Sequence, residues 1–280
     1  MYVVRELKAA GYEVIGLSAS QTPSEPSWIT VNLLDRKAMR AAVAAVQPDF
    51  VLHLAAMSYV GHGDVEEIYR VNIIGTRNLL DALALLKRQP QMVVLASSAN
   101  IYGNADVEPI SEDTPPRPEN DYAVSKLAME YMAQMWMDRL PIVITRPFNY
   151  TGVGQSEQFL IAKIVGHFRR GERTIELGNT DVLRDFGDVR DVAQTYMAIL
   201  NARPVGKTLN ICTGIGHSVD DILDMMVSIA GYRIDIRISS TFVRAHEVRR
   251  LVGSRLKLSD EIDLKTPTPL QETLAWMYAS

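Results

Sequence analysis

The first half of the chain alternates between helical and extended hydrophobic patterns. Apolar residues recur at helical spacing in four segments and predict α-helices in residues 2–10, 35–46, 64–88 and 121–139. Short apolar runs predict strands between these helices, in residues 12–17, 50–54, 92–97 and 142–145. Residues 93–96 are continuously apolar, which is typical of a strand covered on both faces. Strands that alternate with helices in this way predict a parallel sheet built from βαβ units.

The second half of the chain is less regular but mixes the same two kinds of element. Helical patterns predict three further helices, in residues 157–170, 188–201 and 218–230. Extended patterns predict two strands, in residues 209–212 and 234–238. Ser218 is expected to cap the helix that follows it, with Asp221 three positions further on. The whole chain is therefore predicted to have an α/β fold.

The start of the sequence departs from the usual order of a doubly wound α/β domain. Such a domain normally opens with a strand, a Gly-rich turn that holds a pyrophosphate, and a helix. Here residues 1–10 already have a helical pattern, and no G-x-G-x-x-G follows at any strand–helix junction. Without the first, central strand its two neighbours keep unpaired backbone groups, each costing about 1–3 kcal/mol when buried. We therefore expect the natural protein to begin roughly a dozen residues earlier; the alternative is a different fold that never contained this strand.

Composition and charge exclude several classes of protein. The chain has 280 residues, of which 47% are apolar and 22% charged, as is ordinary for a globular protein. Its net charge is −4 and it has no basic block, which argues against a general nucleic-acid-binding protein. No apolar run approaches the roughly 18 residues of a membrane span, so no membrane partner is expected. Cys212 is the single cysteine, which fits a reducing, cytoplasmic location, and the histidines lack metal-binding spacing.

Tyr122 and Lys126 are the strongest candidates for chemistry. They stand four residues apart on a predicted helix and therefore share one face. An ammonium group near a phenol stabilises the phenolate, so we expect the pKa of Tyr122 to lie below the usual value of about 10. Such a tyrosine can act as an acid or a base near neutral pH. Taken alone, such a pair is more often a surface helix pair without a function.

Other segments give this pair a context. Residues 96–103 contain two serines and lie at the carboxyl end of a buried strand. This is the end of the strand where ligands bind in open α/β sheets. Together with further motifs in this order, the chain resembles the extended short-chain dehydrogenase/reductase family, which modifies nucleotide-linked sugars. The motifs that carry the resemblance lie in residues 53–56, 72–76, 96–103, 120–126 and 146–149. The resemblance covers essentially the whole chain.

The resemblance implies a fold of two unequal parts. The first is a Rossmann-type doubly wound parallel sheet that binds NAD(P), in residues 1–150, with an added segment around 185–212. The second is a smaller C-terminal α/β domain for the sugar nucleotide, mainly in residues 151–280. Paired long helices form the dimer contact in this family, so a homodimer through helices 64–88 and 121–139 is expected.

The resemblance also assigns the catalytic roles. Tyr122 would donate or accept the proton at the sugar hydroxyl or ketone, and Lys126 would tune Tyr122 and bind the nicotinamide ribose. Ser98 matches the family's Ser/Thr that also binds the reacting oxygen. The alternatives are a strand-end serine that bonds to backbone and a tyrosine that packs in the core.

Cofactor contacts are implied at the ends of several predicted strands. Ala55 and Ala56 would line the pyrophosphate, Pro147 would lie against the nicotinamide, and Ser18 stands where an acid would bind an NAD ribose. The implied set is completed by Asn32, Leu33 and Leu54, of which the first two match the adenine-contact pair. A serine in place of the acid favours NADP (as NADPH) over NAD, although no arginine follows it to bind the extra phosphate.

A GDP-sugar substrate is implied by arginines in the second half. Arg184 matches the family's nucleotide-binding arginine, and Asn149 matches a residue that touches the substrate diphosphate. The segment 244–254 is similar to one in GDP-mannose dehydratases and GDP-6-deoxy-4-ketohexose reductases. It gives Arg244 a phosphate contact, Glu247 a ribose contact, and Arg249 a possible second phosphate contact. A solvated charged turn is the rival interpretation.

Two residues narrow the reaction class. Family dehydratases carry Asp-Glu after the catalytic Ser/Thr, whereas this chain has Ala99 and Asn100, which can do no such acid–base work. We therefore expect NAD(P)H-dependent reduction of the 4-keto group of a GDP-linked 4-keto-6-deoxy hexose. A nucleotide-sugar 4-epimerase with tightly bound NAD is the first alternative. A non-catalytic cofactor-binding protein or an inactive truncated fragment are alternatives of another class.

Overall fold

Parallel strands form the main sheet, in the order β3-β4-β5-β9. The computed structural model describes residues 1–20, 27–57, 64–239 and 248–280. The four strands of the main sheet are β3 (Phe50–His53), β4 (Met92–Ala96), β5 (Ile142–Pro147) and β9 (Thr208–Ile211). All neighbouring pairs are parallel, with Ala96 opposite Thr145 and Arg146 opposite Asn210. The parallel α/β architecture predicted from the sequence is therefore confirmed.

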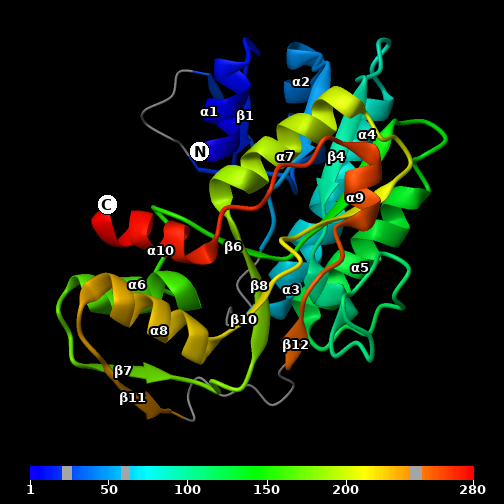
Figure 1. Ribbon diagram of the computed structural model, residues 1–280. Helices are drawn as coiled ribbons and strands as arrows, with labels where there is room; N and C mark the ends of the chain where they lie inside the picture. The colour runs from blue at the N-terminus through cyan, green and yellow to red at the C-terminus, as the bar shows by residue number, and fades with distance from the viewer. Residues whose placement is uncertain (21–26, 58–63, 240–247) are drawn as a thin grey trace.

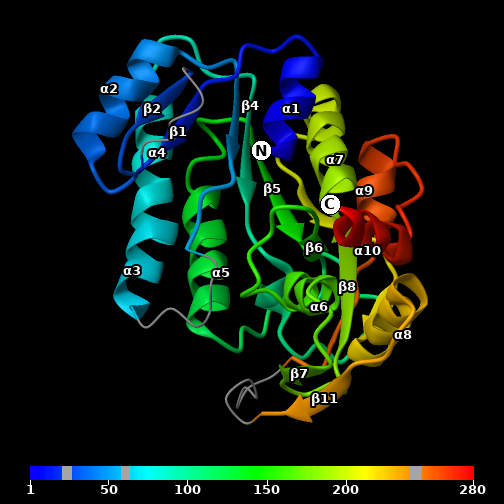
Figure 2. The same cartoon turned by 90° about the vertical axis from the view of Figure 1, so that its left-hand side faces the viewer.

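Helices cover both faces of this sheet. The helices that pack on it are α1 (Tyr2–Ala9), α2 (Arg36–Val46), α4 (Thr76–Ala84), α5 (Asp121–Gln134), α7 (Val189–Ala202) and α9 (Leu256–Glu261). Figure 2 shows β4 and β5 between a layer of α2, α4 and α5 and a layer of α1 and α7. Val93 and Leu95 pack in the core under the first layer, whereas Met92 and Val94 pack under the second. This alternation explains why the strand is continuously apolar.

A second parallel pair, β1 (Gly16–Ser18) and β2 (Trp28–Thr30), stands apart from the main sheet. In the part of the chain that the structure describes, no strand pairs with both β1 and β3, so the parallel strands form two sheets. Side chains beside this break are open to solvent, with Ile15 37% and Leu54 42% exposed, and α1 has no buried residue. The sequence predicts this interruption, because the central strand of the doubly wound order is missing from the 280 residues.

The long helix expected over residues 64–88 is interrupted. It consists of α3 (Val65–Tyr69), a π-helix η1 (Arg70–Gly75) and α4, and it ends at Ala84. In the π-helix the side chain of Asn72 turns to polar partners outside the helix. A π-helix turn is wider than an α-helical turn and interrupts the regular hydrogen bonding of the helix. The hydrophobic periodicity of the sequence does not reveal such an interruption. The helix expected over 121–139 is also shorter, since α5 ends at Gln134.

A second layer of structure lies beyond the ends of the main strands. A mixed sheet joins β6 (Asn149–Thr151), β8 (Leu183–Asp188), β10 (Gly216–Ser218) and β12 (Arg250–Leu251). A separate parallel pair is formed by β7 (Thr174–Leu177) and β11 (Asp235–Ile238). The helices of this layer are α6 (Leu160–Arg169), α8 (Val219–Ala230) and α10 (Leu270–Ala279). They share one hydrophobic core, and Figure 1 shows them as a lobe apart from the main sheet.

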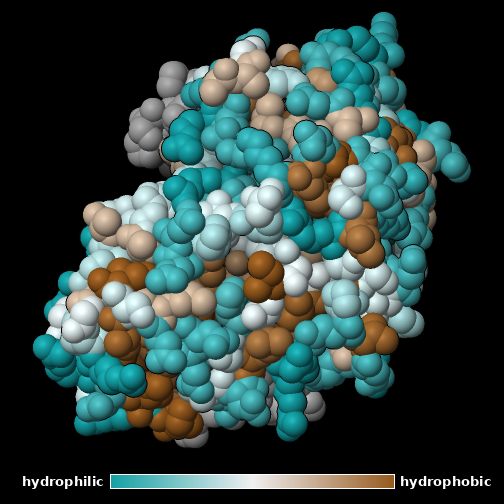
Figure 3. Space-filling view, in the orientation of Figure 1, coloured by the Kyte–Doolittle hydropathy of each residue, from teal (hydrophilic) through white to brown (hydrophobic). Residues whose placement is uncertain are grey.

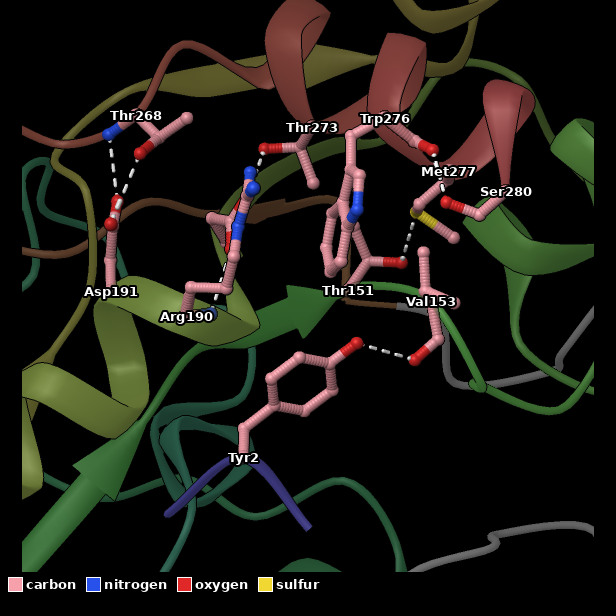
Figure 4. A network of polar contacts seen from close by, with 11 residues as sticks. Tyr2, Thr151, Val153, Arg190, Asp191, Thr268, Thr273, Trp276, Met277 and Ser280 are labelled. Carbon is pink, nitrogen blue, oxygen red and sulfur yellow. Dashed lines mark hydrogen bonds and ion pairs between the residues drawn. The ribbon is translucent and has the colours of Figure 1, made fainter. Parts of the chain in front are cut away.

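The C-terminal helix α10 fastens this lobe to the start of α7 (Figure 4). Thr273 donates to the buried Asp188 carboxylate at 2.8 Å, and Asp188 also binds Arg190 at 2.6 Å. The guanidinium of Arg190 lies 3.9 Å from the ring centroid of Trp276. Since Asp188 is the N-cap of α7, one carboxylate connects the end of β8, the start of α7 and the last helix.

The face shown in Figure 3 is largely hydrophilic, with hydrophobic residues in separate patches. One patch lies over the lobe of α8, β7 and β11, where Ile236 is 39% and Ile238 60% exposed. Among the described residues, none of the helices has the length and apolar content needed to cross a membrane.

Candidate active site

Ser98, Tyr122 and Lys126 converge at the carboxyl end of β4. Ser98 caps the short helix η2 (Ala99–Tyr102), and Asn120 caps α5 by accepting a hydrogen bond from the Ala123 amide at 2.9 Å. Tyr122 and Lys126 lie on one face of α5, as predicted, and the two side chains of Ser98 and Tyr122 are hydrogen-bonded. The Lys126 Nζ donates to the Ala96 carbonyl at 2.6 Å and lies 6.0 Å from the Tyr122 ring centroid.

Burial dominates the electrostatics of these groups. Tyr122 is 8% and Lys126 4% exposed. Burial raises the pKa of Tyr122 to about 12, and the Ser98 hydrogen bond offsets this only in part. Burial also lowers the pKa of Lys126 to about 8, against an opposing effect of Glu130. The expectation that Lys126 lowers the pKa of Tyr122 is therefore wrong for this structure, because the loss of hydration outweighs an ammonium that faces a backbone carbonyl.

His53, at the end of β3, is a neutral neighbour of this group. Burial and then the charge of Lys126 lower its pKa to about 3. Its Nε2 lies 2.9 Å from the Thr76 hydroxyl, which itself donates to the Asn72 carbonyl at 2.7 Å. Because Thr76 gives its proton to Asn72, the imidazole carries its proton on Nε2 and donates to Thr76. The ring therefore joins β3 to the start of α4, directly after the π-helix, and adds no charge beside Lys126.

Asn72 is a positioning residue to which the sequence assigned no role. Its Nδ2 donates to the Ser125 hydroxyl at 3.0 Å and to the Met57 carbonyl at 3.2 Å. Its Oδ1 accepts from the Met57 amide at 2.9 Å. One buried amide thus joins the π-helix, the catalytic helix α5 and the loop after β3. Its place in the motif 72–76 was the available signal, but the sequence alone does not show what its side chain meets.

The predicted cofactor residues occupy the carboxyl ends of successive strands. Ser18 is half-buried, and its hydroxyl accepts from the Ser20 amide at 3.3 Å. The Asn32 side chain is exposed and accepts from the Leu34 amide at 2.9 Å, whereas Leu33 packs against the core. After β3, Leu54 and Ala55 are exposed and Ala56 is half-buried; Pro147, which ends β5, is half-buried too.

These residues fit the two ends of a dinucleotide. Small, open side chains after β1 and β3 leave room for an adenosine and a pyrophosphate, while Lys126 bonds to the end of β4 and Pro147 ends β5. The Gly-rich amide cradle that normally holds the pyrophosphate is not among the 280 residues. The side chains at these strand ends therefore fit a dinucleotide.

The predicted substrate residues are only partly brought together. The Asn149 amide donates to the Asp185 carbonyl at 3.2 Å and lines a cavity of about 350 Å³ on the side of α7, away from the catalytic three. The Arg184 guanidinium donates to the carbonyls of residues 183, 248 and 249 and so holds β12 against β8. Arg249 is exposed. Arg244 and Glu247 lie outside the described residues.

A scan against family models matches residues 1–212 to the NAD dependent epimerase/dehydratase family. The chain belongs to this family. It is 33% identical over 258 residues to the GDP-6-deoxy-D-talose 4-dehydrogenase of Aggregatibacter actinomycetemcomitans, covering 92% of this chain and 84% of that protein. It is 32% identical over 238 residues to the GDP-6-deoxy-D-mannose reductase of Pseudomonas aeruginosa, covering 81% and 78% of the two chains.

Solved structures of family members have the same fold. A protein from Burkholderia cenocepacia J2315 is 50% identical, with a TM-score of 0.93 over 99% of this chain and 92% of the other. RMD from Pseudomonas aeruginosa, solved with NADPH, is 30% identical with a TM-score of 0.82, over 99% and 94%. The UDP-glucose 4-epimerase of Thermus thermophilus, solved with NAD, is 26% identical with a TM-score of 0.87, over 99% and 94%. This family's members, as named, modify nucleotide-linked sugars with NAD or NADPH.

Proposed function

We propose that this family member reduces the 4-keto group of a GDP-linked 4-keto-6-deoxy hexose, giving GDP-rhamnose or its C4 epimer. The observation that carries the proposal is the grouping of Ser98, Tyr122 and Lys126 at the end of β4, with Ala99 and Asn100 where a dehydratase would need two acids. A tyrosine with a pKa near 12 holds its proton at neutral pH, which is the form that a reduction requires. The names of the two curated relatives, both for GDP-6-deoxy sugars, support the same substrate class.

The roles of the chain's own residues follow from their contacts. When bound, the reduced nicotinamide cofactor supplies hydride to C4 of the sugar. Tyr122 donates its hydroxyl proton to the C4 oxygen, and Ser98, hydrogen-bonded to Tyr122, binds the same oxygen. The ketone thus gains one hydride and one proton and becomes an alcohol. The Tyr122 phenolate left behind lies beside the Lys126 ammonium, which remains charged up to about pH 8. Burial of all three groups excludes water from the proton transfer.

NADPH is the proposed reductant. Ser18 at the end of β1 presents no carboxylate to repel a ribose phosphate, and its hydroxyl and the Ser20 amide are already close enough for a hydrogen bond. Residues 1–150, joined by α7 and β9, are proposed to bind this cofactor. Residues beyond 150, apart from α7 and β9, are proposed to bind the sugar nucleotide. The cytoplasmic location expected from the lone Cys212 stays a prediction.

A homodimer is proposed through the exposed faces of η1 and α5. Val124 and Tyr131 on α5 and Met135, the C-cap of α5, follow each other at spacings of seven and four and are 38%, 60% and 75% exposed. Ile74 on the neighbouring π-helix is 47% exposed. A second copy of the same face would cover this apolar stripe.

The test is to incubate the protein with the GDP-linked 4-keto-6-deoxy hexose and NADPH. NADPH binding is measured first by fluorescence, so that a failure to bind is separated from a failure to reduce. We expect one NADPH to be oxidised for each 4-hydroxy sugar formed, as followed by absorbance and NMR. Bound NADPH with no oxidation would refute the reductase. Interconversion of C4 epimers without net cofactor consumption would instead identify the 4-epimerase, and absent binding would identify an inactive fragment.

A further inference from the structure

A buried ion pair lies behind the catalytic face and has no part in the chemistry proposed above. The Arg146 Nε and Nη2 donate to the two Glu130 carboxylate oxygens at 3.0 and 2.7 Å. The side chains are 11% and 3% exposed. Burial lowers the pKa of Arg146, but the bonds to Glu130 raise it by more, so the guanidinium stays charged. Taking both charges of this bidentate ion pair out of water is costly. Its burial is therefore weak evidence that the pair serves only to stabilise the fold.

The pair is part of a network that reaches the serine loop. The Arg146 Nη1 donates to the Tyr102 hydroxyl at 2.9 Å and to the Glu112 carbonyl at 3.1 Å. Tyr102 ends the helix η2 that Ser98 caps, and its hydroxyl donates to the Asn210 Oδ1 at 2.7 Å. The network therefore connects α5, which carries Tyr122 and Lys126, to the segment that carries Ser98.

Glu130 also continues the catalytic face of α5. Tyr122, Lys126 and Glu130 stand four residues apart in turn, and all three are buried. The negative charge of Glu130 opposes the effect of burial on the Lys126 ammonium. The titratable groups linked to Lys126 itself are Tyr122 and Glu130 on α5 and His53 on β3. Tyr150 on β6 and Tyr196 on α7 interact electrostatically with Tyr122, whereas Tyr102, Arg146 and Glu112 belong to the network around Glu130.

Glu130 is the acid that acts on Lys126 directly. His53 is neutral and Tyr102, Tyr122 and Tyr196 have raised pKa values, so they carry no charge at neutral pH. Glu112 is turned to the Asn210 amide at 2.6 Å. Arg146 binds Glu130 from the side of β5, which fixes the carboxylate while reducing its field at Lys126.

We propose that Glu130 and Arg146 are positioning residues for the catalytic group: Glu130 keeps Lys126 charged in its buried place, and Arg146 fixes Glu130 and aligns the Ser98 segment with α5. The consequence for turnover rests on the proposed reductase, but the charge relation between Glu130 and Lys126 does not. Removal of the Glu130 charge takes away the negative charge that favours the Lys126 ammonium and leaves Arg146 without its buried partner.

The test measures Lys126 directly in the protein without cofactor or substrate. Lysines are labelled with ¹³C at Cε, the Lys126 signal is assigned by its loss in Lys126→Met, and its chemical shift is followed against pH. We expect the pKa of Lys126 to fall by about one pH unit in Glu130→Gln. The double variant Glu130→Gln/Arg146→Met removes both charges and should fall between the wild type and Glu130→Gln. Glu130→Asp, which keeps the charge, should restore most of the wild-type value.

One control separates this effect on Lys126 from a general loss of structure. Asp81→Asn removes a carboxylate that binds Arg36 and Arg40 on the other end of the helical layer, and it should leave the Lys126 titration unchanged. If Glu130→Gln fails to fold, the pKa of Lys126 in the double variant is compared with that in Glu130→Asp instead. An unchanged Lys126 titration in a folded variant that lacks Glu130 would overturn the proposal.

The pH dependence of kcat adds the catalytic consequence. In Glu130→Gln the part of the pH–kcat profile that reports the ionisation of Lys126 should move to lower pH by the same amount as the NMR titration. The KM for the sugar nucleotide should change little. A shifted NMR titration in a protein with no reductase activity would leave the Glu130–Lys126 relation intact and refute the proposed function alone.

Discussion

Lys126 is buried at the cost of folding stability. Its pKa falls from 10.5 to about 8 because the ammonium loses hydration, and the bonds to Ala96 and the field of Glu130 compensate only in part. Below pH 8 the group is protonated in the folded and the unfolded chain, so the whole penalty is present. Between about pH 8 and 10.5 the unfolded chain binds more protons, so this contribution to stability rises with pH.

Lys126→Met should therefore stabilise the fold at pH 7 while it abolishes activity. The expected gain in the free energy of unfolding is up to about 3 kcal/mol, and it should shrink as the pH rises above 8. Urea titrations at pH 7 and pH 10 measure the difference. A variant that is less stable than wild type at pH 7 would contradict the assigned burial.

His53 lowers the stability of the folded chain at acidic pH. Its pKa is about 3 when folded and 6.5 as a free group, so the unfolded chain takes up a proton first as the pH falls. Stability is then lost between pH 6.5 and 3, by up to about 5 kcal/mol. His53→Gln can still donate to Thr76 and should lose less stability over that range, whereas His217→Gln should behave as wild type. Thermal melts from pH 7 to pH 4 measure this, and parallel curves for His53→Gln and wild type would refute it.

At this scale the sequence predicted which side chains meet but not their charge. The four-residue spacing placed Tyr122 and Lys126 together, and the order of motifs brought Ser98 to them. The direction of the Tyr122 pKa was wrong, because burial depends on the elements that cover a helix face and not on its own spacing. Arg184 binds backbone carbonyls, and partners of that kind cannot be read from side-chain patterns. Its expected contact with the substrate stays a prediction.

At the scale of elements, helix caps set where the site begins. Asn120 and Asp35 cap α5 and α2 by the same contact, each accepting from the amide three residues on at 2.9 Å. α5 carries Tyr122 in its first turn, whereas α2 carries no residue of the site. Loss of either cap should therefore cost a similar amount of stability. Only the cap of α5 supports a helix that carries a residue of the site.

Asn120→Ala and Asp35→Ala should each lower the free energy of unfolding by about 1 kcal/mol. Only Asn120→Ala should also lower kcat, because fraying of the first turn of α5 displaces Tyr122. Chemical denaturation and steady-state kinetics on the same samples check both parts. Equal kcat in the two variants would show that the cap does not position the tyrosine.

The elements themselves were predicted well where a strand or helix has one clear period. α2, α7 and α8 begin and end within two residues of the expected ranges, and α8 starts with the predicted Ser218–Asp221 capping box. The π-helix was missed, since Asn72 and its partners are tertiary contacts. Short strands such as β8, β10 and β12 were also missed, because each is defined by its neighbours rather than by its own pattern.

At the scale of the whole molecule, the exposed stripe of η1 and α5 predicts association. Met135→Glu places a charge in the centre of an apolar contact and should shift the protein from dimer to monomer. Lys257→Glu, on α9 across the sheet, is the matched control and should leave the dimer intact. Light scattering after size exclusion gives both masses. A monomeric wild type, or a dimer that survives Met135→Glu, would refute this interface.

The central claim is that Tyr122 donates the proton in a GDP-keto sugar reduction. The most direct measurement compares wild type, Tyr122→Phe and the control Tyr131→Phe, which keeps the ring of the proposed dimer face, in the NADPH-dependent reduction, with urea stability measured alongside. We predict that Tyr122→Phe loses at least about 100-fold in kcat, the contribution typical of a positioned proton donor, while Tyr131→Phe and the stability of both variants stay near wild type. Full activity in a folded Tyr122→Phe would contradict the account.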